Sequence, residues 1–261
     1  MSRKRNSRAT TSHRHNGNVV ELTQALYLNG RAMQEGPKRK TWSRHDLKFV
    51  KPLTPAQEEM FRDFIEGNNV FAHGSAGTGK SFVALFLAMQ EMLRVESQID
   101  RVIIVRSAVP ARDVGFLPGT LEEKNAVYEQ PYRDIFADLF GKKSTYDDMK
   151  DAGYIEFVTT SFIRGMTWDN AIVVFDEVQN ANWEEANTVM TRIGDSSRII
   201  ICGDVKQNDL LYKKMDKTGI STLLEVTKRM PDFTNVTFTR HDIVRSDFVK
   251  QFIIACEDLG V

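Results

Sequence analysis

The chain has 261 residues, of which 41% are hydrophobic, and its 35 basic residues balance its 35 acidic residues. This composition is ordinary for a globular protein and allows one large α/β domain with a tail. No apolar stretch reaches the roughly 18 residues that a membrane span needs, and no apolar segment follows the basic N-terminus as it would in a secretory signal. We therefore expect a cytoplasmic protein without a membrane partner.

Residues 1–51 are expected to form a basic, partly disordered N-terminal arm and linker. They carry 12 Lys and Arg residues and three acidic ones, so their formal charge of +9 is balanced by −9 in residues 52–261. Residues 1–17 lack the apolar side chains that a core requires, whereas residues 19–35 contain a short predicted helix. A basic arm on an acidic body indicates an anionic partner such as nucleic acid, or a tail that only keeps the protein soluble.

Residues 52–261 are predicted to form one domain in which helices and strands alternate. The expected helices cover residues 54–67, 81–95, 127–141, 182–194, 219–230 and 246–259. The expected strands cover residues 68–74, 101–107, 154–160, 171–177, 197–204 and 235–240. Continuous apolar strands between helices are typical of a mostly parallel sheet with helices on both faces. Cys202 lies inside one of these strands and is interpreted as a core residue.

Residues 74–81, GSAGTGKS, fit the phosphate-binding pattern G-x-x-x-x-G-K-[ST] and lie between a predicted strand and a predicted helix. Glycines let such a loop curl so that its N–H groups face a phosphate, and the following helix adds its positive end. Lys80 is expected between the β- and γ-phosphates of ATP, and the Ser81 hydroxyl on Mg²⁺. The predicted nucleotide-binding residues of the loop are Gly74, Ser75, Ala76, Gly77, Thr78, Gly79, Lys80 and Ser81.

Four more polar residues, in three segments, accompany this loop. The apolar run of residues 172–175 ends in Asp176 and Glu177, which fit a Walker B element: Asp176 would hold Mg²⁺ and Glu177 would activate the attacking water. Gln207 follows the next strand in a G-D-x-x-Q pattern that resembles motif III of superfamily-one helicases, and its amide would report the γ-phosphate. Gln57 has an amide that could pair with the adenine edge, at the distance of the Q-motif glutamine of helicases.

Residues from about 52 to 258 resemble the PhoH-like family of ATPases, particularly the short versions carried by phages. GSAGTGKSFVAL is similar to the family's GPAGTGKTYLA, and FIRGMTWDNAIVVFDEVQNAN to MRGRTLNDAFIILDEAQN. The most specific stretch is RSAVPARDVGFLPGTLEEK, because GFLPG followed by L-x-E-K is not part of generic P-loop proteins. HDIVRSDFV is similar to DVVRHPLV. The chain departs from the family's proline, threonine, arginine and histidine at Ser75, Ser81, Met166 and Ser246.

The resemblance implies a RecA-like P-loop fold, ATPase activity, ring-like oligomers and a link to RNA metabolism, in the cytoplasm of a bacterial host if a phage encodes the chain. Because only one RecA-like domain fits, the arginine that reaches the γ-phosphate would come from a neighbouring subunit of a ring, expected as a hexamer. Arg245 is preferred for this role and Arg240 is the alternative. Arg245 could instead form an ion pair within its own subunit.

The predicted function is ATP hydrolysis that acts on, or is regulated by, RNA or single-stranded DNA. One alternative is a nucleotide-gated nucleic-acid-binding module with little motor activity. Another is a small-molecule kinase, but the chain has no dedicated lid sequence. Trp42 would either stack on a base or pin the linker to the domain. Nucleic acid would bind the arm and its basic linker, or else Arg106 and Arg112 beyond the edge of the sheet.

Overall fold

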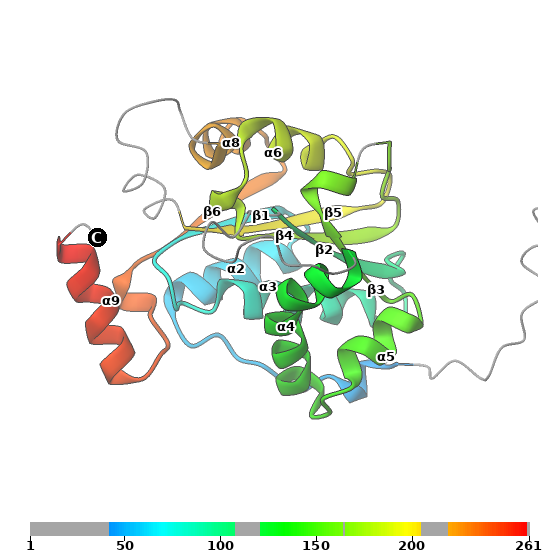
Figure 1. Cartoon of the computed structure of the whole chain (residues 1–261), viewed down its shortest axis with the longest axis horizontal. Coiled ribbons are helices and arrows are strands. Elements are labelled where there is room, and N and C mark those ends of the chain that lie inside the picture. Colours follow the sequence, from blue (N-terminus) through cyan, green and yellow to red (C-terminus); the bar gives the residue numbers. More distant parts are fainter. Residues whose placement is uncertain (1–41, 108–120, 164, 205–218, 260–261) are drawn as a thin grey trace, which may run out of the picture. The chain divides into compact units, whose positions relative to one another are not determined.

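The computed structural model describes residues 42–107, 121–163, 165–204 and 219–259, drawn in colour in Figure 1. The basic residues 1–17 and the helix predicted within residues 19–35 lie outside this part of the chain. So do Arg112 and Gln207.

Within the described residues, a six-stranded sheet forms the centre of the compact unit that begins at Trp42. The strand order is β3-β2-β4-β5-β1-β6, and all neighbouring strands run parallel. The carboxyl ends of the strands therefore meet at one edge, where open α/β sheets bind ligands. The strands are β1 (Asn69–Gly74), β2 (Arg101–Arg106), β3 (Ile155–Thr159), β4 (Ala171–Asp176), β5 (Arg198–Gly203) and β6 (Phe233–Phe238).

Helices cover both faces of this sheet (Figure 1). One face carries α2 (Pro55–Ile65), α3 (Lys80–Met92), α4 (Leu121–Phe140) and α5 (Thr145–Asp151), and the other carries α6 (Trp183–Met190) and α8 (Gly219–Thr227). Neighbouring strand residues enter opposite cores: Val70 and Ala72 pack on the α2–α3 side, and Phe71 packs on the α6–α8 side. The predicted α/β fold, a parallel sheet with helices on both faces (Figure 1), is confirmed.

The element bounds differ from prediction mainly around α4 and α5. Helix α4 begins at Leu121 rather than at residue 127, and α5 was not predicted. Its sequence TYDDMKD is too short and acidic to show an apolar period, but Tyr146 and Met149 are buried in the core. Tertiary packing therefore forms this helix rather than local preference.

Residues 42–51, predicted as part of the linker, pack against the domain. Trp42 is 9% exposed and Leu47 is 6% exposed. The Trp42 ring meets Phe140 of α4 edge-on, with the ring centroids 5.5 Å apart. Trp42 therefore has the pinning role of the two that were predicted. A last helix, α9 (Asp247–Leu259), follows β6. Among the described residues, no helix has the length and apolar character to cross a bilayer.

Candidate functional site

The loop of residues 74–81 turns between β1 and α3, where the sequence predicted it. Gly74, Gly77 and Gly79 have φ angles of 121°, 71° and 81°, which favour glycine. At Gly74 a side chain is also excluded by space, because a Cβ atom would overlap the carbonyl oxygen of Phe238 in β6. The glycine pattern is thus required by both backbone conformation and the neighbouring strand.

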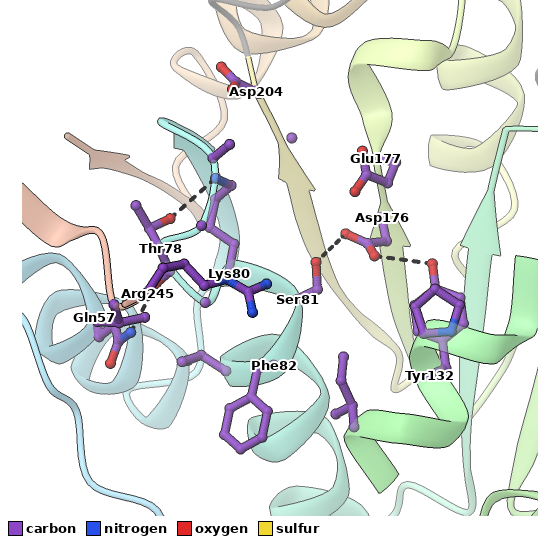
Figure 2. A pocket seen from close by; sticks show the side chains of 18 of the residues that line it. Gln57, Thr78, Lys80, Ser81, Phe82, Tyr132, Asp176, Glu177, Asp204 and Arg245 are labelled. Atoms are coloured by element: carbon purple, nitrogen blue, oxygen red, sulfur yellow. Dashed lines mark hydrogen bonds between the residues drawn. The ribbon is translucent and has the colours of Figure 1, made fainter. Parts of the chain in front are cut away.

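Lys80 lies at the centre of this loop. Its ammonium donates hydrogen bonds to the carbonyl oxygens of Gly74 at 2.9 Å and Ser75 at 2.7 Å. It also donates to the Thr78 hydroxyl at 3.3 Å (Figure 2). Burial lowers the pKa of Lys80, and the carboxylate of Asp204 most strongly opposes that shift. The ammonium is therefore held by oxygen acceptors that phosphate oxygens could replace.

Ser81 and Asp176 meet at the mouth of the loop. The Ser81 hydroxyl donates to Asp176 Oδ1 at 2.7 Å, and the Tyr132 hydroxyl of α4 donates to Asp176 Oδ2 at 3.0 Å (Figure 2). Tyr132 is 1% exposed, and burial raises its pKa well above the ordinary value, so it stays a donor. Adjacent hydroxyl and carboxylate oxygens suit Mg²⁺, so the two residues fit the predicted metal site. Tyr132 itself was not predicted.

Glu177 follows Asp176 in a left-handed backbone conformation, with φ at 53°. Such a conformation is costly for a residue other than glycine and is often found at functional sites. Burial, and then the neighbouring Asp176, raise the pKa of Glu177. A carboxylate of raised pKa is a stronger base, which suits the predicted role in activating water.

Gln179 holds Glu177 in place, and the sequence prediction missed it. Its amide nitrogen donates to Glu177 Oε2 at 2.6 Å, and its amide oxygen accepts from the backbone N–H of Asp204 at 3.1 Å. It therefore joins the end of β4 to the end of β5. A usable sequence signal exists, because the family stretch DEAQN carries the same glutamine.

These residues line one pocket of about 630 Å³, together with Gln57, Arg106 and Arg245. Arg106 lies at the carboxyl end of β2. Its positive charge lowers the pKa of Glu177 and so opposes part of the rise that burial causes. Arg106 lies in the wall of this pocket, and its predicted contact with nucleic acid stays a prediction. Gln207, the predicted phosphate sensor, lies outside the described residues.

Gln57 contacts the loop rather than standing apart from it. Its amide nitrogen donates to the carbonyl oxygen of Thr78 at 2.9 Å, and its amide oxygen accepts from the Leu53 backbone at 2.8 Å. The side chain is 3% exposed. The amide therefore fixes the start of α2 against the loop, and its predicted contact with adenine stays a prediction.

The two candidate arginines have different surroundings. Arg240 forms ion pairs with Glu257 at 3.3 Å and Asp258 at 2.7 Å in its own chain. Arg245 is exposed and lines the pocket, and a Cβ atom on Gly77 would lie 3.1 Å from Arg245 Cγ. Within the described part of the chain, no carboxylate forms an ion pair with Arg245. Its side chain thus lies beside the loop of its own subunit (Figure 2).

A family model described as PhoH-like protein matches residues 49–257. The PhoH-like protein of Bacillus subtilis (strain 168) is 34% identical over 209 residues, which cover 80% of this chain and 64% of the relative. The PhoH-like protein of Mycobacterium tuberculosis (strain ATCC 25618 / H37Rv) is 33% identical over 210 residues, which cover 80% of this chain and 58% of the relative. Protein PhoH of Escherichia coli (strain K12) is 32% identical over 188 residues, which cover 71% and 52%. The chain thus spans about half to two thirds of the length of these relatives.

Solved structures are similar at lower identity. The large terminase of a thermophilic bacteriophage in complex with ADP is 13% identical, with a TM-score of 0.47, over 77% of this chain and 49% of the terminase. Pif1 helicase from Candida albicans is 14% identical, with a TM-score of 0.40, over 81% of this chain and 44% of the helicase.

Proposed function

Because the chain belongs to the PhoH-like family of P-loop nucleoside triphosphatases, we propose that it binds ATP with Mg²⁺ and hydrolyses the terminal phosphate. One observation carries the proposal. Lys80, the Ser81–Asp176 pair and the Gln179–Glu177 pair converge on the same pocket from the carboxyl ends of two strands, β1 and β4. This is the set of groups that phosphoryl transfer to water requires.

The roles of these groups follow from their chemistry. The loop N–H groups and the Lys80 ammonium would bind the phosphates and stabilise the charge that develops on them. Bound Mg²⁺, held by Ser81 and Asp176, would neutralise charge on the phosphate oxygens. Glu177 would take the proton of the attacking water, while Gln179 keeps its carboxylate turned toward the pocket.

Lys80→Ala tests the proposal. Removing one preorganised charged donor at the phosphates should lower turnover about 100-fold or more, while the thermal unfolding temperature stays close to that of the parent. Lys142→Ala is the matched control, because Lys142 pairs with Asp148 on the surface. Phosphate release should be measured without any acceptor substrate, which separates an ATPase from the kinase alternative. An unchanged rate in folded Lys80→Ala protein would refute the assignment.

The nucleic-acid partner, RNA or single-stranded DNA, is proposed from the +9 charge of residues 1–51. Because Trp42 is buried, the deletion that tests the arm should end at residue 41 and leave the domain intact. If the arm binds phosphates, the deletion should lower the affinity for nucleic acid. It should also make the slope of log affinity against log salt concentration less steep. An unchanged slope would exclude the arm. Strong stimulation of ATP turnover by RNA would favour a motor over a nucleotide-gated binding module.

A ring-like homo-oligomer, expected as a hexamer, also stays a prediction, as do a phage origin and a cytoplasmic location in a bacterial host. Native mass measurement tests the oligomer directly. Mixing Lys80→Ala subunits with Arg245→Ala subunits then tests Arg245. Recovered turnover supports action across an interface, whereas no recovery at any ratio means that Arg245 serves the pocket beside which it lies.

A further inference from the structure

Ser75 connects the phosphate-binding loop to the C-terminal helix. It is fully buried, and its hydroxyl donates to Glu257 Oε1 of α9 at 2.6 Å, across 182 positions of sequence. Its carbonyl oxygen accepts the Lys80 ammonium at 2.7 Å. The same residue therefore touches both the cation that would bind phosphate and a carboxylate on α9.

Glu257 is held on its other side by Arg240. The Arg240 Nε atom lies 3.3 Å from Glu257 Oε2, and its guanidinium also pairs with Asp258 at 2.7 Å. The Glu257 side chain is only 14% exposed. A continuous chain of polar contacts thus runs from Lys80 through Ser75 and Glu257 to Arg240.

Helix α9 is otherwise attached lightly. None of its residues is buried. Its apolar contact with the loop is made by Ile253, whose Cδ1 atom would lie 3.1 Å from a Cβ atom on Gly77. Just before the helix, the Val244 backbone N–H donates to the Gly77 carbonyl oxygen at 3.0 Å. An element with few buried apolar contacts opens at low free-energy cost, so changes in the loop can be passed to it.

We propose that Glu257 is a positioning residue of the phosphate-binding loop, and that α9 loosens from the loop when nucleotide phosphates bind. This inference rests on the proposed nucleotide-binding function. Phosphate oxygens would draw the Lys80 ammonium away from the Ser75 carbonyl oxygen. They would also bring negative charge to the loop, whose Ser75 is hydrogen-bonded to the Glu257 carboxylate. The phosphates and this carboxylate would then repel each other, and such repulsion is strongest where water is scarce.

The chain contains its own reporter for this motion. Of its two cysteines, Cys202 is 1% exposed, whereas Cys256 is partly exposed and lies on α9 beside Glu257. The rate at which a thiol reagent labels Cys256 should be measured with and without Mg²⁺ and a non-hydrolysable ATP analogue. Binding of a fluorescent analogue is measured separately on the same samples. Loss of one hydrogen bond to a charged group should raise the labelling rate about 10- to 100-fold when nucleotide binds.

Two variants identify the contact. Ser75→Ala should be labelled fast even without nucleotide, and its labelling should not rise further at an analogue concentration that saturates this variant in the binding measurement. Glu257→Gln keeps an acceptor for Ser75 but removes the charge. Without nucleotide it should therefore be labelled as slowly as the parent, and its labelling rate should rise less than the parent's when nucleotide binds. Ser144→Ala is the matched control, because it removes a serine–carboxylate bond to Asp148 in α5, away from the loop. It should behave as the parent.

The outcomes separate this inference from the proposed function. If the analogue binds and the labelling rate of the parent does not change, α9 does not respond and the inference is overturned, while the ATPase proposal stands. If Ser75→Ala keeps the full response, the Ser75–Glu257 contact is not the link. If the parent binds no nucleotide at all, both proposals are overturned.

Discussion

Replacing Gln179 by methionine tests whether the amide orients the predicted catalytic base. Methionine has a similar volume, so packing beside Gly203 is largely kept. The amide is lost, however, and with it the 2.6 Å bond to Glu177 and the 3.1 Å bond from the Asp204 backbone. Both consequences can be measured.

The expected magnitudes follow from these two bonds. A hydrogen bond to a charged group contributes about 1.5–3 kcal/mol. If the Gln179–Glu177 bond is fully used in the transition state, kcat should fall about 10- to 100-fold. The loss of the acceptor for Asp204 should lower the free energy of unfolding by about 1 kcal/mol. Nucleotide affinity should change little, because Gln179 holds the base rather than the phosphate-binding loop.

Steady-state turnover, binding of a fluorescent ATP analogue and thermal unfolding should therefore be compared in Gln179→Met and the parent. Gln130→Met is the matched control. Gln130 also donates its amide to a carboxylate, that of Asp134 at 3.0 Å, but the bond is exposed and Asp134, although it lines the pocket, has no predicted catalytic role. A Gln179→Met protein whose kcat stays within twofold of the parent, with the expected loss of stability, would show that the Gln179 contact is only structural.

Three further predictions concern the same site and its supporting strand. Glu177→Gln should bind ATP like the parent but turn it over about 100-fold more slowly or worse; turnover within twofold would point to another base. Tyr132→Phe removes a donor from Asp176, so the Mg²⁺ concentration for half-maximal turnover should rise about tenfold, and an unchanged titration would contradict this. The pKa of His73 is lowered to about 4 by burial and by Lys228. As pH falls through 6.5, His73 is therefore protonated in the unfolded chain but not yet in the folded chain. The free energy of unfolding consequently falls as pH drops from 7 toward 4. The loss is about 1 kcal/mol at pH 5, allowing for partial exposure. Urea unfolding at several pH values should show this loss of unfolding free energy in the parent but not in His73→Gln. An equal dependence of the unfolding free energy on pH in the two proteins would refute the prediction.

Much of the protein follows from the sequence, because the relevant signals are local. A glycine-rich loop between an apolar strand and an apolar helix specifies a phosphate cradle within a few adjacent residues. Likewise, continuous apolar strands specify a sheet buried on both faces. These patterns place Lys80, Ser81, Asp176 and Glu177 at one edge of the sheet, because parallel strands end on the same side.

Tertiary structure decided which side chains support these groups. Tyr132 reaches Asp176 only because α4 packs on the sheet, where the ring of Tyr132 lies 5.9 Å from that of Phe157 in β3. Nothing in a buried tyrosine on a helix indicates a partner 44 positions away. Tertiary contacts also direct the Gln57 amide to the loop, bury Trp42 against Phe140 and pair Arg240 with α9.

Ser75 shows the physical reason most clearly. Local sequence determines the backbone path of its loop, but the bond of its hydroxyl to Glu257 depends on how the chain returns 182 positions later. Hydrogen bonds are short and directional, so such partners are specified by packing in three dimensions and leave no periodic pattern in the sequence.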